Sequence, residues 1–278
     1  MAERESLIRL AVFGKPVSHS LSPLIHRQFA RQFGLAIDYR AVECSPAEFE
    51  QRVRDLALAG GRGCNVTVPL KNAAWKLAGQ CSPEAEQAQA ANTLIMESPA
   101  EIYADNTDGR GLVADLRQRL AQDLAGKRIL VVGAGGAAAG ILADLLQQGP
   151  AEVVLANRTP ERAWAMARHF AALGRVSSHA LDSLEKLEPF DLVINATSLG
   201  LSGLAPPLNA SLFAPDGLCY DLNYGAAAGP LRRHCEYLGV QYRDGLGMLV
   251  AQAAISFYLW TGCEPDSDQV LQALRKDH

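Results

Sequence analysis

The sequence predicts an α/β protein built from two domains. Its 278 residues exceed the length of one small domain, and 49% of them are hydrophobic, which is enough for two cores. Short apolar runs alternate with helix-length segments in both halves of the chain. One such run, RILVV at 128–132, leads into a glycine-rich turn, and this turn indicates that a second domain begins there.

The first domain is predicted from residue 10 to about residue 96. Helix-length segments at 23–33 and 46–60 separate its apolar strands, which are LAVFG, IDYRAVEC and GCNVTV. Ser22 followed by Pro23 is typical of a helix start, with the serine hydroxyl capping free N–H groups. Side chains that precede this helix would face its N-terminus.

The second domain follows a linking helix predicted at 111–124. Its strands are continuous apolar runs, which is typical of a parallel sheet buried on both faces, and they are RILVV, AEVVLA, FDLVIN and GLCYDL. From residue 247 the pattern is helical again, with a buried helix at 248–260 and a last helix capped by Asp266. The apolar pattern alone leaves open which domain these helices join.

Composition excludes several classes of protein. The net charge is −4 and no basic block occurs, so neither nucleic acid nor a membrane surface is an expected partner. No apolar stretch reaches the roughly 20 residues that span a bilayer, and MAERESLIRL lacks the order of a secretory signal, so we expect a cytoplasmic protein. The six cysteines are scattered and the six histidines lack metal-site spacing, so we expect reduced thiols and no metal.

A dinucleotide site is predicted at residues 133–138, GAGGAA, between a strand and a helix. Gly133 permits the tight turn, Gly135 lets the backbone approach a pyrophosphate, and Ala138 allows close packing of helix on strand. Ala134, Gly136 and Ala137 complete the expected cofactor loop. This is the pattern of a Rossmann-like domain.

The next strand indicates the choice of cofactor. An acidic residue at its end would bind the ribose hydroxyls of NAD, but the strand ends in Asn157, Arg158 and Thr159, with Arg162 one turn further. Guanidinium groups there suit a 2′-phosphate, so the sequence favours NADP over NAD. A solvated pair of surface arginines is the alternative interpretation.

Polar residues cluster in short segments of the first domain, at 18–23, 65–71, 92–93 and 105–109. Hydroxyls, amides, one lysine and carboxylates suit a polyhydroxylated anion, because each ring substituent needs a partner once water is expelled. Singly, these residues also fit helix caps and turns.

Together with the cofactor turn, these segments resemble one family. GKPVSHSLSP, NVTVPLK, ANTL, DNTDG, GAGGAAA, ANRT, NATSLG, YDLNY and DGLGMLVAQAA are similar, in order and spacing, to the shikimate dehydrogenases. The resemblance implies an NADP enzyme of aromatic biosynthesis that reversibly reduces 3-dehydroshikimate to shikimate. It also implies that the C-terminal helices return to the substrate domain.

The resemblance assigns roles to individual residues. Ser20, Ser22 and Tyr224 would bind the substrate carboxylate, and the residues that would bind the ring hydroxyls are Asn65, Thr67, Asn92 and Gln252. Thr197, Ser198 and Gly245 would lie near the cofactor, although a loop after a buried strand would contain such residues anyway.

Lys71 and Asp108 would be the catalytic pair. Carbonyl reduction needs a proton at oxygen, and Lys71 is the only lysine in the polar segments, while Asp108 would orient it. The sequence leaves open which of the two transfers the proton.

Two segments depart from the family pattern. The cofactor loop continues as AAAG where relatives often carry a larger polar or basic residue, and GAAAG replaces polar residues after YDLNY. The first departure removes a side chain that could contact a cofactor phosphate, and the second changes the composition of the loop.

We therefore expect a substrate domain at 1–111, an NADP domain at 112–246 and C-terminal helices at 247–278 that rejoin the first, with a cleft between the domains. The partners would be small molecules, in a monomer or homodimer. Two alternatives stay open, namely a quinate/shikimate dehydrogenase that uses NAD and a non-catalytic NADP-binding regulator.

Overall fold

The computed structural model describes residues 7–276 and divides into two compact units. The first unit runs to Gly111 and resumes at Val250, and the second is Leu112–Leu249. The chain thus returns to the first unit three residues after the boundary expected at 246/247. The expectation about a signal sequence concerns residues 1–10, of which 1–6 lie outside the described part, as does His278.

The first unit contains, within the described residues, a mixed sheet in the order β2-β1-β3-β5-β6-β4. β1 pairs in parallel with β2 and β3, whereas β5 is antiparallel to β3 and β6. The strands are β1 Ile8–Gly14, β2 Ile37–Glu43, β3 Gly61–Val66, β4 Gln80–Cys81, β5 Thr93–Ser98 and β6 Glu101–Asp105.

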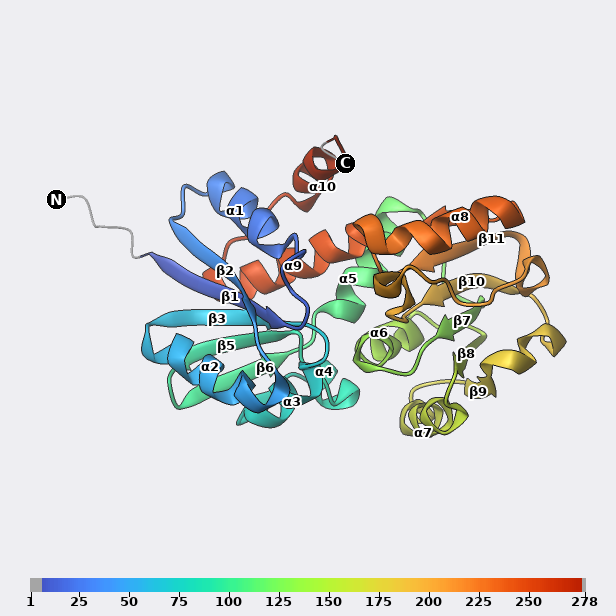
Figure 1. Ribbon diagram of the computed structural model, residues 1–278, viewed down its shortest axis with the longest axis horizontal. Coiled ribbons are helices and arrows are strands. Elements are labelled where there is room, and N and C mark those ends of the chain that lie inside the picture. The colour runs from blue at the N-terminus through green and yellow to red at the C-terminus, as the bar shows by residue number, and fades with distance from the viewer. Residues whose placement is uncertain (1–6, 277–278) are drawn as a thin grey trace. The chain divides into compact units, whose positions relative to one another are not determined.

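Helices cover both faces of this sheet (Figure 1). Alternate residues of β1 point to opposite faces, so Ala11 and Phe13 pack with the core under α2, whereas Leu10 and Val12 share a core with Trp260 of α9. The helices are α1 Ser22–Gln32, α2 Pro46–Leu58, α3 Lys71–Leu77, α4 Pro83–Ala88, α5 Asp108–Ala114, α9 Leu246–Thr261 and α10 Ser267–Lys276. α5 and α9 each contain residues of both units.

The second unit contains a wholly parallel sheet in the order β12-β11-β10-β7-β8-β9. Counted from β7 as the first strand, this is the Rossmann order 3-2-1-4-5-6 read from the β9 edge, so the predicted fold class is confirmed. The order reverses between β7 and β10. The strands are β7 Arg128–Val132, β8 Glu152–Asn157, β9 Val176–Ala180, β10 Phe190–Asn195, β11 Phe213–Asp221 and β12 Gln241–Arg243.

The central strand β7 is buried on both faces. Ile129 and Val131 join the core of α6 and α7, and Leu130 and Val132 join the core on the α8 side. The helices of this unit are α6 Gly136–Gln147, α7 Pro160–Phe170 and α8 Gly229–Leu238, with short helical turns η1 Asp115–Arg119, η2 Leu181–Lys186, η3 Leu199–Ser202, η4 Ala210–Leu212 and η5 Gly225–Ala228.

The helix predicted at 111–124 is wrong at both ends. It begins at Asp108, where the Asp108 N–H donates to Asn106 Oδ1 at 3.1 Å, and it loosens into the π-helical turn η1. Asp115 is buried there and accepts a hydrogen bond from the Tyr220 hydroxyl at 2.7 Å. Ala121 then has a positive φ of 51°, which ends the helix.

One predicted cap is confirmed and one is wrong. Asp266 Oδ1 accepts from the Gln269 N–H at 2.9 Å at the start of α10. Ser22 does not cap α1, because the helix begins at Ser22 itself and the Ser22 N–H donates to Ser20 Oγ at 3.3 Å.

Within residues 7–276, no helix has both the length and the apolar character needed to cross a membrane. The same residues contain no cluster of three His, Cys, Asp or Glu suited to a metal ion. All six cysteines are free.

Candidate active site

Lys71 and Asp108 form an ion pair in the first unit. Lys71 is the first residue of α3, two residues after the cis bond that precedes Pro69, and Asp108 is the first residue of α5. Their side chains are only 12% and 8% exposed. The ammonium and the carboxylate predicted to act together are therefore in contact and largely shielded from solvent, where charge interactions are stronger than in water.

Both oxygens of the Asp108 carboxylate are engaged. Oδ2 faces the Lys71 ammonium, and Oδ1 accepts from Asn92 Nδ2 at 2.8 Å. An ammonium has three N–H bonds, so the pair leaves Lys71 with donors for a further oxygen. Asp108 is thus held as an acceptor, and Lys71 is the member of the pair with protons to offer.

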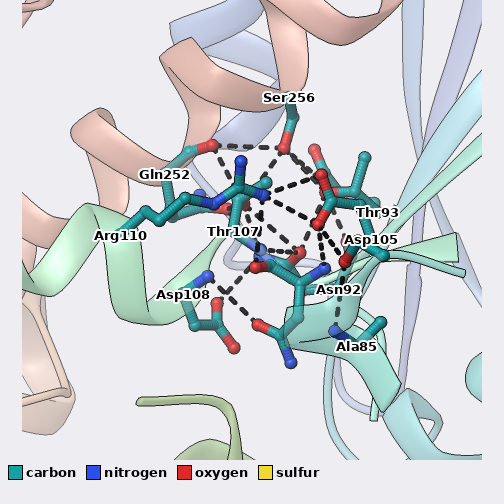
Figure 2. Close-up of polar contacts among 12 residues, drawn as sticks. Ala85, Asn92, Thr93, Asp105, Thr107, Asp108, Arg110, Gln252 and Ser256 are labelled. Carbon is teal, nitrogen blue, oxygen red and sulfur yellow. Dashed lines mark hydrogen bonds and ion pairs between the residues drawn. The ribbon is translucent and has the colours of Figure 1, made fainter. Parts of the chain in front are cut away.

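Asn92 lies at the centre of a buried polar network (Figure 2). Its Nδ2 also lies 2.8 Å from Thr107 Oγ1 and 3.0 Å from Gln252 Oε1, so its two hydrogens are shared among three acceptors, while its Oδ1 accepts from the Thr107 N–H at 2.9 Å. Gln252 belongs to α9, and the backbone of α9 comes this close because Gly111 has no side chain: a Cβ there would stand 2.6 Å from Gln252 Cβ. Three predicted site residues, Asn92, Asp108 and Gln252, are therefore joined.

Asn65 lies in a second part of the same network. Its Nδ2 donates to Ser256 Oγ at 3.1 Å and to Thr93 Oγ1 at 3.2 Å, and its Oδ1 accepts from the Tyr39 hydroxyl at 2.7 Å. The sequence analysis did not identify Ser256 or Tyr39 as site residues. The signal for Ser256 was its position four residues after Gln252 on an otherwise apolar helix, which places both polar side chains on one face.

The turn before Asp108 is fixed by a buried carboxylate. Asp105 accepts two hydrogen bonds from Arg110 Nη2, both at 2.7 Å (Figure 2). It accepts a third from Ser82 Oγ at 2.7 Å. Asn106 donates its side-chain amide to the Ala90 carbonyl at 2.8 Å. These bonds hold the backbone from which the Asp108 side chain projects.

The other predicted substrate residues lie at strand and helix ends. Ser20 is half-buried, and Ser22, in the first turn of α1, is buried. Thr67 follows β3, and a Cβ at Gly14 would stand 2.3 Å from the Thr67 methyl group, so the two residues pack closely. Tyr224, in the second unit, is half-buried and precedes η5.

The predicted cofactor turn has the expected backbone. Gly133 has a φ of 119°, donates its N–H to the Ala156 carbonyl at 2.7 Å and leaves no room for a side chain, since a Cβ would stand 2.9 Å from the Ala196 oxygen. Gly135 and Gly136 are exposed at the start of α6, and no atom lies within 4 Å of the Cβ position of Gly135. Ala134 and Ala137 beside them are half-buried.

The residues predicted to select NADP surround the end of β8. Arg158, Thr159 and Arg162 are exposed, at and just after the strand end. Asn157 donates its side-chain amide to the Thr159 carbonyl at 3.0 Å, which shapes the turn into α7. Both guanidinium groups thus belong to one turn at the carboxyl end of the sheet.

A third polar network joins the ends of β10 and β11. Asp221 Oδ1 accepts from Asn195 Nδ2 at 2.9 Å and from Asn223 Nδ2 at 2.8 Å, and Asn195 Oδ1 accepts from the Thr197 hydroxyl at 2.7 Å. Burial raises the pKa of Asp221 to about 6, against the opposing effect of these hydrogen bonds. Ser198 next in the chain is exposed. Asn195, Asp221 and Asn223 lie in the segments NATSLG and YDLNY that carry the resemblance, but no individual role was predicted for them.

Gly245 belongs to the same region. Its N–H donates to the Asn223 carbonyl at 2.9 Å, and a Cβ there would stand 2.5 Å from the Leu222 oxygen. Only glycine fits this approach, so the position has a packing reason as well as the predicted cofactor role.

Comparison with known proteins decides the family. Residues 12–94 match the model of the shikimate dehydrogenase substrate binding domain, residues 115–201 that of shikimate / quinate 5-dehydrogenase, and residues 245–275 that of the shikimate 5'-dehydrogenase C-terminal domain. The shikimate dehydrogenase (NADP(+)) of Alkalilimnicola ehrlichii is 48% identical over 97% of this chain and 99% of its own length. The chain belongs to the shikimate dehydrogenase family.

Two solved structures have the same fold. The shikimate 5-dehydrogenase of Thermus thermophilus in complex with shikimate is 36% identical, with a TM-score of 0.83, over 97% of this chain and 98% of that one. The Ael1 enzyme of Pseudomonas putida is 40% identical, with a TM-score of 0.86, over 96% and 98% of the two chains. The resemblance inferred from short motifs is therefore confirmed along nearly the whole chain.

Proposed function

We propose that this member of the family is an NADP-dependent shikimate dehydrogenase, which reversibly reduces 3-dehydroshikimate to shikimate. The observation that carries the proposal is the shielded Lys71–Asp108 ion pair, held in place by Asn92. Relatives at 46–48% identity that carry the name shikimate dehydrogenase (NADP(+)) support it, as does the Thermus thermophilus structure in complex with NADP(H) and shikimate.

Lys71 is the proton donor in this proposal. When the ketone carbon receives a hydride, its oxygen takes a proton from the Lys71 ammonium, so that the C=O double bond becomes a C–OH group and Lys71 is left as a neutral amine. Asp108 remains a carboxylate, because its two oxygens already accept from Lys71 and Asn92. Oxidation of shikimate reverses the proton transfer.

The substrate residues divide by chemistry. Ser20 and Ser22 supply hydroxyl donors for the carboxylate, and the residues for the ring hydroxyls are Asn65, Thr67, Asn92 and Gln252. Three of these four share the buried hydrogen-bond network around Asn92 and Ser256. A network of this kind favours a polyol, because its donors and acceptors are already in position to bond the hydroxyl groups of the substrate.

The residues of the second unit fit NADP. The exposed backbone of Gly135 and Gly136 at the start of α6, beside Ala134 and Ala137, would hold the pyrophosphate after the tight turn at Gly133. The residues for the ribose and its 2′-phosphate are Asn157, Arg158, Thr159 and Arg162. Thr197, Ser198 and Gly245 would line the nicotinamide side. NADPH supplies the hydride when it is bound.

An assay with purified protein tests the proposal. We expect shikimate-dependent formation of NADPH, and a 10²–10⁴-fold lower kcat in Lys71→Ala with NADP binding retained. Lys76→Ala is the matched control, since Lys76 is an exposed lysine of the same helix. A non-catalytic regulator would bind NADP but would form no NADPH with shikimate.

The nearest alternative is a quinate/shikimate dehydrogenase that uses NAD. The description of the model matched at 115–201 includes both substrates, so the same assay should compare quinate with shikimate and NAD with NADP. Equal kcat/KM values for the two cofactors would favour the alternative.

We also propose a cytoplasmic enzyme, active as a monomer or homodimer, that acts on small molecules and not on nucleic acid. Six free cysteines are typical of a protein in a reducing compartment. A net charge of −4 gives no general attraction for nucleic acid. Sedimentation of the purified protein would give the oligomeric state.

A further inference from the structure

Tyr39 is a buried residue of β2 whose hydroxyl contacts the predicted substrate residues. The residue is 4% exposed, and its hydroxyl donates to Asn65 Oδ1 at 2.7 Å. Burial raises the pKa of Tyr39 well above its usual value. The hydroxyl therefore keeps the proton that it donates to Asn65.

His26 fixes the ring of Tyr39. The imidazole stacks on the phenol ring with a centroid distance of 4.5 Å and an interplanar angle of 8°. Phe29 and Trp260 enclose the other sides of the imidazole, with centroid distances of 5.8 Å and 5.3 Å. A ring held in this way cannot turn, so the direction of the Tyr39 hydroxyl is set by packing.

The Tyr39 hydroxyl and the Asn92 carbonyl together fix the Asn65 amide. An amide end group has an acceptor and a donor of nearly equal size, and its orientation follows from its partners. The Asn92 carbonyl can only accept, so Nδ2 faces it at 3.2 Å, and Oδ1 is left to accept from Tyr39 at 2.7 Å. The Thr93 and Ser256 hydroxyls, 2.7 Å apart, can each act as donor or acceptor and would tolerate either orientation.

We propose that Tyr39 is a positioning residue for substrate recognition, which holds and orients the Asn65 amide together with the Asn92 carbonyl. The inference rests on the proposed function, in which Asn65 binds a ring hydroxyl of the substrate. Tyr39 then sets the position from which Asn65 meets that hydroxyl. It acts through Asn65 and takes no part in proton transfer.

Tyr39→Phe tests this directly, because it removes only the hydroxyl and keeps the ring on His26. We expect the KM for shikimate and the Kd measured by calorimetry to rise about tenfold, since Asn65 Oδ1 loses its buried donor. The kcat and the KM for NADP should stay within about twofold of the wild-type values.

Tyr220→Phe is the matched control. Tyr220 is also fully buried, and its hydroxyl donates to a side chain, Asp115 Oδ2, at the same distance of 2.7 Å. Removing this hydroxyl should lower stability to a similar degree and leave the shikimate KM unchanged. An equal rise of the shikimate KM in both variants would mean that general destabilisation is responsible, and the proposal would be wrong.

A double-mutant cycle separates action through Asn65 from other effects. In an Asn65→Ala background, Tyr39→Phe should change the shikimate Kd less than threefold, because the amide that it orients is gone. A full tenfold effect in that background would overturn the proposal. Wild-type protein that binds NADP but neither binds nor oxidises shikimate would instead refute the proposed function, so the two failures are distinguishable.

Discussion

His26 links the stability of the first unit to pH. Burial lowers the pKa of its imidazole from 6.5 to about 3, and neither ring nitrogen has a hydrogen-bond partner among the described residues. The unfolded chain therefore takes up a proton below pH 6.5 that the folded chain does not. This group does not reduce the free energy of unfolding above pH 6.5. As the pH falls toward 3, the free energy of unfolding falls by up to about 5 kcal/mol.

His26→Phe should remove this pH dependence. The stability difference between wild type and variant should change by roughly 2–3 kcal/mol between pH 7 and pH 4.5, in favour of the variant at acid pH. Urea unfolding followed by tryptophan fluorescence measures it, since Trp260 lies against the ring. His169→Phe, at an exposed position, is the control. Parallel curves for wild type and His26→Phe would contradict the prediction.

Arg158 and Arg162 should determine the preference for NADP. Replacing both by Gln removes two charge-assisted contacts to the 2′-phosphate, so the ratio of kcat/KM for NADP to that for NAD should fall by about 10²-fold or more. Steady-state kinetics with both cofactors gives the ratio.

The same helix offers a control for these variants. Arg168 lies in the last turn of α7 and stacks on Trp164 at 4.7 Å, so Arg168→Gln should leave the ratio unchanged. An undiminished preference for NADP in the double variant would show that the two arginines are ordinary surface residues.

At the scale of elements, the end of β11 carries the carboxyl group of Asp221. Its effect on the stability of the fold has the opposite pH dependence to that of His26. The pKa of Asp221 is raised to about 6, so the folded chain keeps a proton that the unfolded chain has released above pH 4. Stability therefore falls as the pH rises from about 4 to about 7, by up to roughly 3 kcal/mol.

Asp221→Asn should abolish that slope. The amide oxygen can still accept from Asn195 and Asn223, and the new N–H₂ group faces the Tyr242 hydroxyl, which can accept from it. Relative to wild type, the variant should gain about 3 kcal/mol between pH 4 and pH 7 in urea unfolding experiments. A constant difference across this range would mean that Asp221 is ionised throughout.

Elements buried on both faces were predictable from sequence. The strand FDLVIN was predicted at the residues that form β10, because a central parallel strand is a continuous apolar run. β9, with the sequence VSSHA, and β12 are half-buried or exposed edge strands and lack such a run. The linking helix was misplaced because a buried contact between Asp115 and Tyr220, 105 positions apart, has no local signal.

The site was predictable where a residue type has few alternative uses in its segment. Lys71 was identified in this way, as the only lysine of the polar segments, whereas Asp108 was identified through the family resemblance. The two form an ion pair in the structure. Tyr39 and Asp221 could not be found, since a tyrosine in a strand and an aspartate at a strand end are both common. Their roles depend on contacts with Asn65 and Asn195, each 26 positions away, that only the fold creates.

At the scale of the whole molecule, each unit has its own sheet and its own cores on two faces. A ligand that binds one unit slows local opening there, because binding stabilises the closed backbone. The two ligands of the proposed reaction should therefore protect different amides from hydrogen exchange when each is added alone.

Hydrogen exchange followed by mass spectrometry tests this assignment. Shikimate alone should slow exchange in peptides that contain residues 65–71 and 105–111, and NADP alone in peptides that contain 133–138 and 157–162. Peptides from the edge strand β9 serve as the internal control, because neither ligand is expected to contact it. Protection of residues 65–71 by NADP alone would contradict the division of substrate and cofactor between the two units.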